Sequence, residues 1–163
     1  MSGERALFID RDGTVVEEPP DGQVDSLAKL RLLPGVIPAL LELGRAGYRL
    51  VMVGNQDGLG SASFPEPGFR EPQEFLRDLL ASQGIVFDAE FFCPHLPADG
   101  CDCRKPRTGL LAGYLASRTL DLERSYVIGD SESDMQFAAN IGLEGLRVRA
   151  DGADGATWAA IVE

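Results

Sequence analysis

The feature that most constrains the fold is a set of short apolar segments, each of which stops at a glycine or a polar residue. Side chains within these segments are apolar at successive positions, as expected of strands that are buried on both faces of a parallel sheet. The three clear segments are residues 6–9 (ALFI), 50–53 (LVMV) and 126–128 (YVI). Two weaker candidates are residues 89–92 and 145–149.

Helical patterns separate the apolar segments. Apolar residues at helical spacing occur in residues 35–46, 71–83, 108–119 and 132–141, and a short last helix is predicted at 155–162. Gly47 and Gly84 predict where the first two helices stop. Ser131 and Asp134 have the spacing of a capping box at the start of the fourth. The alternation of strands and helices predicts an α/β fold, a doubly wound parallel sheet. We expect one domain over residues 1–163, with 150–163 as a C-terminal tail or linker.

The strand ends carry the polar groups that chemistry needs. Asp10 follows the first clear strand, Gly54-Asn55 ends the second, and Gly129-Asp130 ends the third. In doubly wound sheets, ligands bind beyond the carboxyl ends of the strands. Three independent strand ends therefore deliver polar groups to one edge, where we expect the site.

Two carboxylates one residue apart suit a two-step phosphoryl transfer. Asp10 can attack phosphorus and form an aspartyl-phosphate. Asp12 can protonate the leaving oxygen and then activate water. Gly13 lets the backbone turn tightly around the site. The pattern is also that of an ordinary acidic turn, and the other strand ends are what favour catalysis.

Asp130 can share a Mg²⁺ with Asp10 and the backbone carbonyl of Asp12, since Mg²⁺ prefers oxygen ligands and retains several waters. Asp134 can orient a metal-bound water or pair with Lys105, or it can simply cap a helix. Lys105 can neutralise phosphate charge as phosphorus is attacked. It can also be an ordinary surface lysine, but its crowding with two arginines in Arg104-Lys105-Pro106-Arg107 favours the phosphate role.

A second set of residues indicates a metal loop. Cys93, His95, Cys101 and Cys103 lie within eleven residues and include every cysteine and the single histidine of the chain. A Cys₃His set is a normal closed tetrahedral zinc site, which leaves no open position for water. We therefore expect a structural zinc in loop 93–103 that fixes Lys105; a catalytic zinc is the less favoured alternative.

Charge and composition narrow the class of partner. The net charge of -11 disfavours binding to nucleic acid, because such a surface repels phosphate backbones. No apolar run approaches the ~20 residues that span a bilayer. The first residues do not resemble a secretion signal, and an odd cysteine count argues against a disulfide framework. A cytoplasmic protein without membrane contact is expected, as a monomer or a small homo-oligomer.

These motifs resemble those of the haloacid dehalogenase superfamily. The resemblance rests on Phe8 to Thr14, Asn55, Arg104-Lys105-Pro106 and Gly129-Asp130 through Asp134, in the family's order and spacing. It implies a Rossmann-like fold and the aspartyl-phosphate mechanism described above. The second aspartate, Asp12, fits the phosphatases of the superfamily. The segments in which this family carries a cap domain are too short for one here.

One position departs from the family pattern. The second strand of these enzymes normally ends in Ser or Thr, whose hydroxyl holds a phosphate oxygen, and here the residue is Gly54. Loss of such a hydrogen bond costs roughly 1–3 kcal/mol, which predicts a reaction slowed by about 5- to 150-fold. The backbone N–H groups of Gly54 and Asn55 can still bind phosphate.

Within the superfamily, the chain most resembles the histidinol-phosphate phosphatases of histidine biosynthesis. The resemblance rests on residues 14–34, 51–60 and the compact CPHLPADGCDCRKP segment. It implies a small phosphate monoester with a cationic amine and imidazole, and in some bacteria a fusion to a dehydratase. The residues that can complement this substrate are Glu17, Glu18, Asp21, Gln23 and Asp57, although residues 17–21 can also be a solvated acidic loop.

Three alternatives stay open. Heptose-bisphosphate phosphatases share the zinc loop, but typically have a longer insertion in it and Asn-Gln-Ser where this chain has Asn55-Gln56-Asp57. A polynucleotide 3′-phosphatase conflicts with the acidic charge. A weakly active zinc-binding scaffold domain is favoured only by Gly54.

Overall fold

The computed structural model describes residues 3–150 and 155–162. Within them the chain forms a five-stranded sheet in the order β3-β2-β1-β4-β5, and every neighbouring pair is parallel. The strands are β1 (Ala6–Ile9), β2 (Arg49–Asn55), β3 (Ala89–Cys93), β4 (Tyr126–Gly129) and β5 (Glu144–Arg147). The parallel α/β sheet predicted from the apolar segments is confirmed.

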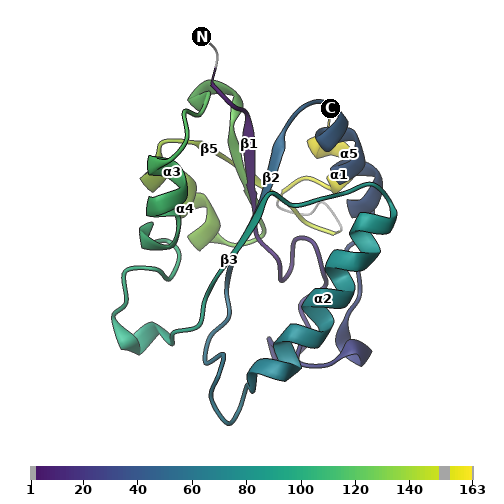
Figure 1. Cartoon of the computed structure of the whole chain (residues 1–163), viewed down its shortest axis with the longest axis vertical. Coiled ribbons are helices and arrows are strands. Elements are labelled where there is room, and N and C mark those ends of the chain that lie inside the picture. Colours follow the sequence, from purple (N-terminus) through teal and green to yellow (C-terminus); the bar gives the residue numbers. More distant parts are fainter. Residues whose placement is uncertain (1–2, 151–154, 163) are drawn as a thin grey trace.

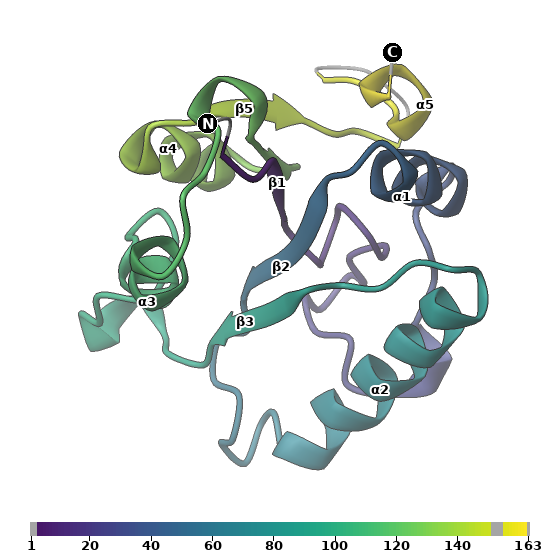
Figure 2. The ribbon, with the colours of Figure 1, turned by 45° about the horizontal axis from the view of Figure 1, so that its top comes forward.

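Helices cover both faces of the sheet (Figures 1 and 2). Helices α1 and α2 lie on one side, α3 and α4 lie on the other, and α5 lies beside α1. The helices are α1 (Val36–Arg45), α2 (Glu66–Ser82), α3 (Ala112–Ala116), α4 (Glu132–Ile141) and α5 (Trp158–Ile161). Short 3₁₀ turns occur at Leu27–Lys29, Pro97–Asp99, Gly109–Leu111 and Leu122–Arg124.

Strand β1 explains why a buried parallel strand is apolar throughout. Leu7 and Ile9 belong to the core on the α1 and α2 side, whereas Ala6 and Phe8 belong to the core on the α3 and α4 side. All four side chains are almost fully buried. Successive side chains point to opposite faces of a strand, so a strand covered on both faces has no position for a polar residue.

Two helices differ most from their predicted bounds. Helix α2 begins at Glu66, before the predicted residue 71, because Pro67 lies in its first turn, where a proline removes no helical hydrogen bond. Pro72 lies buried inside the same helix. The helix predicted at 108–119 is a 3₁₀ turn followed by the short α3, and Gly109 and Gly113 weaken the helical preference there.

The described C-terminal residues pack onto the domain. Of the predicted tail or linker at 150–163, residues 151–154 and 163 lie outside the described residues. Helix α5 contacts α1, and buried Trp158 donates a hydrogen bond from Nε1 to the carbonyl of Thr14 at 2.7 Å. No helix among the residues described is long and apolar enough to cross a bilayer.

The strand order fixes where a ligand can bind. Strand β1 lies between β2 and β4, and the helices that follow β2 and β4 lie on opposite faces of the sheet. The sheet therefore has a switch point at β1, beyond the carboxyl ends of these strands. Asp10, Asn55 and Asp130 lie at this edge. Between β1 and α1, and between β2 and β3, the described residues form no cap domain, as predicted.

Candidate active site

Lys105 lies at the centre of the polar groups that meet at the carboxyl ends of the strands. Its Nζ donates hydrogen bonds to Asp10 Oδ1 at 2.9 Å, Asp134 Oδ1 at 2.6 Å and the carbonyl of Val53 at 2.8 Å. Asn55 holds the backbone of this lysine, since its Oδ1 accepts from Lys105 N at 2.9 Å and its Nδ2 donates to Lys105 O at 3.2 Å. Lys105 is buried, so it is not the ordinary surface lysine of the alternative interpretation.

The electrostatics of this cluster are strongly coupled. Burial raises the pKa of Asp10 well above its usual value; the charge of Lys105 opposes this rise, and Asp134 and Asp130 add to it. Burial alone would lower the pKa of Lys105, but the carboxylates of Asp10 and Asp134 outweigh it and raise this pKa to about 12. Lys105 is therefore a permanent cation beside Asp10.

Three carboxylates form a group that can hold a cation. Oxygens of Asp10, Asp130 and Asp134 lie within 4.8 Å of one another. Thr14 Oγ1 donates to Asp130 Oδ1 at 3.2 Å. Gly13 has a φ of 84°, and a Cβ on it would lie 2.2 Å from Asp130 Oδ2, so only glycine fits this turn. An all-oxygen donor set is the chemistry that Mg²⁺ requires.

Asp134 combines two of the predicted roles. It pairs with Lys105, and it also forms the capping box of α4: its Oδ2 accepts from Ser131 N at 3.2 Å, while Ser131 Oγ accepts from Asp134 N at 3.2 Å. Its carboxylate is thereby held rigidly against Lys105.

Both carboxylate oxygens of Asp12 are occupied. Oδ1 accepts from Arg11 Nη1 at 2.7 Å and Oδ2 accepts from Gln56 Nε2 at 2.9 Å. Asp12 therefore has a fixed orientation at the mouth of the site.

A cavity of about 350 Å³ opens above these groups. Asp10, Asp12, Asn55, Lys105, Asp130 and Asp134 line it together with Glu18, Asp21, Gly22, Gln23, Gln56, Asp57, Phe64, Arg104, Ser131 and Ser133. Burial raises the pKa of Glu18, and the charges of Asp130 and Asp12 add to the rise. Glu17, which was predicted to bind substrate, is not among the lining residues.

Two of the acidic side chains at the mouth already have partners. Asp21 pairs with Lys29 at 2.5 Å. Asp57 accepts two hydrogen bonds from Arg104, at 3.1 Å and 3.0 Å. These ion pairs partly neutralise Asp21 and Asp57. Among the described residues, no ion pair is found for Glu18 in the wall or for Asp130 at the strand end.

Gly54 lies at the buried end of β2 and is not among the lining residues. A Cβ on this residue would lie 3.1 Å from the ring of Phe92 and 3.5 Å from Gln56 Nε2. The ring of Phe92 therefore occupies the space that a side chain at position 54 would enter.

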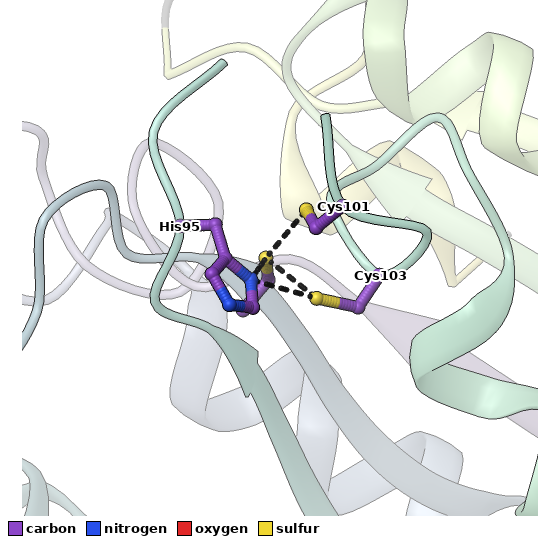
Figure 3. Close-up of side chains that lie close together, drawn as sticks. His95, Cys101 and Cys103 are labelled. Atoms are coloured by element: carbon purple, nitrogen blue, oxygen red, sulfur yellow. Dashed lines mark hydrogen bonds between the residues drawn. The ribbon is translucent and has the colours of Figure 1, made fainter. Parts of the chain in front are cut away.

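The predicted metal loop brings its four side chains together. His95, Cys101 and Cys103 point toward one another (Figure 3), and the ligand atoms of Cys93 and these three residues all lie within 4.8 Å. Burial raises the pKa of Cys93 to about 12; burial also acts to raise that of Cys101, but backbone N–H donors of Cys103 and Arg104 lower it to about 7. Three thiols and an imidazole fit a tetrahedral zinc ion.

Sequence reasoning missed three residues whose side chains contact the aspartates of the site. Thr14 closes the Asp-Arg-Asp-Gly-Thr motif, and its spacing could have indicated its contact with Asp130. Gln56 follows Asn55 at the end of β2, so its position was predictable but its contact with Asp12 was not. No sequence signal distinguishes the fully buried Arg11 from an exposed arginine in a turn.

Known proteins with similar sequences indicate the family of this chain. A family model described as HAD-hydrolase-like matches residues 102–161. The histidine biosynthesis bifunctional protein HisB of Legionella pneumophila (strain Lens) is 54% identical over 145 residues, which cover 89% of this chain and 41% of that protein. HisB of Actinobacillus pleuropneumoniae serotype 3 (strain JL03) is 50% identical over 158 residues, with coverages of 96% and 43%.

A solved structure matches the whole fold. The D,D-heptose 1,7-bisphosphate phosphatase from B. bronchiseptica, complexed with magnesium and phosphate, is 31% identical, with a TM-score of 0.84 over 97% of this chain and 96% of that chain. The chain therefore belongs to the haloacid dehalogenase-like hydrolases. It spans about two fifths of the length of the curated relatives that it matches.

Proposed function

We propose that the chain hydrolyses a phosphate monoester through an aspartyl-phosphate on Asp10, and that its substrate is L-histidinol phosphate. The observation that carries the chemistry is the contact between Asp10 and the buried ammonium of Lys105 at the switch point of the sheet. Lys105 offsets the negative charge that would otherwise repel a phosphate from a carboxylate nucleophile.

In the first step, an Asp10 oxygen forms a bond to phosphorus as the bond from phosphorus to the substrate oxygen breaks. Asp12, in its protonated form, gives its proton to that leaving oxygen, so the alcohol departs neutral. Lys105 keeps its proton throughout, in line with its raised pKa.

In the second step, Asp12 takes a proton from water as the water oxygen attacks phosphorus. The bond between phosphorus and Asp10 breaks, inorganic phosphate leaves, and Asp10 is again a carboxylate. The two steps return both aspartates to their starting protonation states.

We propose that Asp10, Asp130 and the backbone carbonyl of Asp12 hold Mg²⁺. When bound, this ion supplies positive charge opposite the transferring phosphoryl group. Asp134 is assigned to positioning Lys105, because its oxygens are already engaged by Lys105 and Ser131. In the metal loop, we propose a structural zinc on Cys93, His95, Cys101 and Cys103. The relative from B. bronchiseptica was solved with magnesium and phosphate.

The acidic wall of the cavity supports a cationic substrate. Glu18 can pair with the amine or imidazole of histidinol phosphate, and Gln23 can hydrogen-bond the ring. Backbone N–H groups beside Asn55, which lines the cavity, can donate hydrogen bonds to phosphate oxygens. The 54% identity to a histidine biosynthesis protein favours this substrate over heptose bisphosphate, whose phosphatase is 31% identical.

The bifunctional names of the relatives support a second activity beside this domain, which is predicted to be a dehydratase. A cytoplasmic location also stays a prediction.

A bisphosphate is the second candidate because Arg104 lines the cavity. Its guanidinium is, however, already neutralised by Asp57, which leaves little charge for a second phosphate.

The test compares phosphate release from L-histidinol phosphate and from heptose bisphosphate, with Mg²⁺ and with EDTA. We expect magnesium-dependent release that favours histidinol phosphate. Glu18→Gln should raise KM for this substrate by about 10-fold, the loss of one charged hydrogen bond, and leave KM unaffected for a phosphate monoester whose alcohol part carries no positive charge. Preference for the bisphosphate, or no release by folded, metal-loaded protein, would contradict the proposal.

A further inference from the structure

We propose that Arg11 is a positioning residue. Its buried contacts with helix α2 hold it in place, and it orients Asp12 and so controls proton delivery to the leaving group. The inference rests on the proposed function, because it assumes that Asp12 is the general acid and base. It starts from the position of Arg11, whose side chain is fully buried although it carries a charge.

Arg11 points away from the phosphate site and into the face of the sheet covered by α2. Its Nε donates to Gln73 Oε1 at 2.7 Å, and its guanidinium lies over the ring of Phe69 at 4.9 Å from the centroid. Gln73 and Phe69 both belong to α2. The arginine thus joins the motif after β1 to a helix that follows β2.

Stability alone does not account for this arrangement. A buried charge costs free energy unless it is paired and fully hydrogen-bonded. Burial lowers the pKa of Arg11, although Asp12 opposes this. Among the residues described, none accepts a hydrogen bond from Arg11 Nη2. An apolar residue would fill the same space at lower cost, so the charge is better explained by what it does to Asp12.

Asp12 accepts hydrogen bonds from two side chains, one at each carboxylate oxygen. Arg11 Nη1 holds Oδ1 at 2.7 Å and Gln56 holds Oδ2 at 2.9 Å. Asp12 keeps 13% of its side chain exposed at the cavity, whereas Arg11 has none. Two fixed donors restrict rotation of the carboxylate, and misplacement of a catalytic group by about 1 Å can cost about 100-fold in rate.

Gln73, which holds Arg11 from α2, is itself fixed by further contacts. Gln73 donates to Glu90 on β3, whose other oxygen accepts from Arg77 Nε at 2.8 Å. The chain of contacts from Asp12 therefore runs through the interior to the exposed side chain of Arg77 on α2. Because Gln73 has its amide nitrogen on Glu90, its oxygen is oriented toward Arg11.

This role predicts a change that depends on the leaving group. An alkoxide must be protonated as it leaves, whereas a nitrophenolate leaves without help. In Arg11→Gln we expect kcat/KM for L-histidinol phosphate to fall by about 10- to 100-fold, a part of the 10²–10⁴ that a general acid supplies. For p-nitrophenyl phosphate we expect kcat/KM to fall less than about 3-fold on the same basis. Arg11→Lys keeps the positive charge but loses the guanidinium group with its several N–H donors. Its loss in kcat/KM should be smaller than that of Arg11→Gln and larger than zero.

Three companion variants make the test decisive. Asp12→Asn should show the same dependence on leaving group in stronger form. Gln73→Leu, which removes the contact to Arg11 Nε together with those to Glu90 and Met52 Sδ, should show it in weaker form, and it carries the test should Arg11→Gln not fold. Arg70→Met is the matched control on α2, because its exposed ion pair with Glu66 lies outside the chain of contacts; it should leave both rates unchanged.

Equal losses for the two substrates in Arg11→Gln and Gln73→Leu, beside a leaving-group effect in Asp12→Asn, would overturn the role of Arg11 alone. Equal losses in Asp12→Asn as well would overturn the assignment of Asp12, and with it the proposed mechanism.

Discussion

Asp10 illustrates how a single residue carries conflicting electrostatic demands. As the proposed nucleophile it must be ionised, yet burial and two neighbouring carboxylates raise its pKa well above the usual value. Lys105 offsets only part of this effect. The Mg²⁺ proposed for this cluster would relieve the conflict, and a proton and Mg²⁺ would then compete for the same carboxylate.

This competition predicts that magnesium affinity depends on pH. A carboxyl whose folded-state pKa is raised contributes stability that is full below its unfolded pKa and lost as pH rises through the folded value. The metal-free protein should therefore gain more from Mg²⁺ at the higher of two pH values than at the lower, because Asp10, whose pKa is raised, takes up a proton as the pH falls. Thermal unfolding with and without Mg²⁺ at the two pH values measures this.

The control for the magnesium prediction is Asp10→Asn, which cannot titrate at this position. It should bind Mg²⁺ weakly and show a much smaller difference between the two pH values. A stabilisation by Mg²⁺ that is equal at both pH values in the unmodified protein would contradict the account.

Gly54 is the second residue whose environment matters, because its missing side chain is replaced by the ring of Phe92. We expect Gly54→Thr alone to lower the free energy of unfolding by about 1–3 kcal/mol, the usual cost of overpacking. Combined with Phe92→Val, which opens the space, the loss should be smaller than the sum of the single changes by about 0.5 kcal/mol or more. Denaturant unfolding of the four proteins measures the coupling; strict additivity would show that the ring is not the obstacle.

At the scale of elements, the metal loop braces the strand ends that carry the chemistry. Gln56 N donates to Cys93 O at 2.8 Å and Gly58 N donates to Pro94 O at 2.9 Å. Gln56 in turn holds Asp12, and Asn55 holds Lys105. A loss of order in loop 93–103 should therefore affect both the acid and the lysine of the site.

We expect Cys103→Ala to lose its zinc and to lower kcat for histidinol phosphate by about 10-fold or more, since misplaced catalytic groups cost at least this much. Zinc content by mass spectrometry and phosphate release are measured together. Asp102→Asn, in the same loop but outside the ligand set, should keep its zinc and its activity. A zinc-free variant with full activity would show that the metal does not support the site.

Elements whose bounds follow from the local sequence pattern could be predicted. Features that depend on tertiary contacts could not. Strands β1 and β4 were located almost to the residue, because strands buried on two faces leave an unbroken apolar run. The start of α2 was missed because Pro67 resembles a helix breaker, although it is tolerated in a first turn. The pairing of Asp57 with Arg104, 47 residues apart, has no local signal.

At the scale of the whole molecule, the sheet unites the separate motifs. Asp10, Lys105 and Asp130 are distant in the sequence and meet only because β1 lies between β2 and β4. The chain has a net charge of -11, so we expect phosphate to bind only where Lys105 and the proposed Mg²⁺ reverse the local field. The same acidity is consistent with a substrate that has a cationic end, such as the proposed histidinol phosphate.

The central claim is that phosphate passes through a covalent bond to Asp10. The most direct test is to quench the protein in acid during turnover of L-histidinol phosphate with Mg²⁺, reduce it with borohydride and map the peptides by mass spectrometry. Borohydride converts a phosphorylated aspartate to homoserine. The account predicts homoserine at position 10, absent when EDTA replaces Mg²⁺. Full turnover with no modified residue, or with modification at another aspartate, would contradict it.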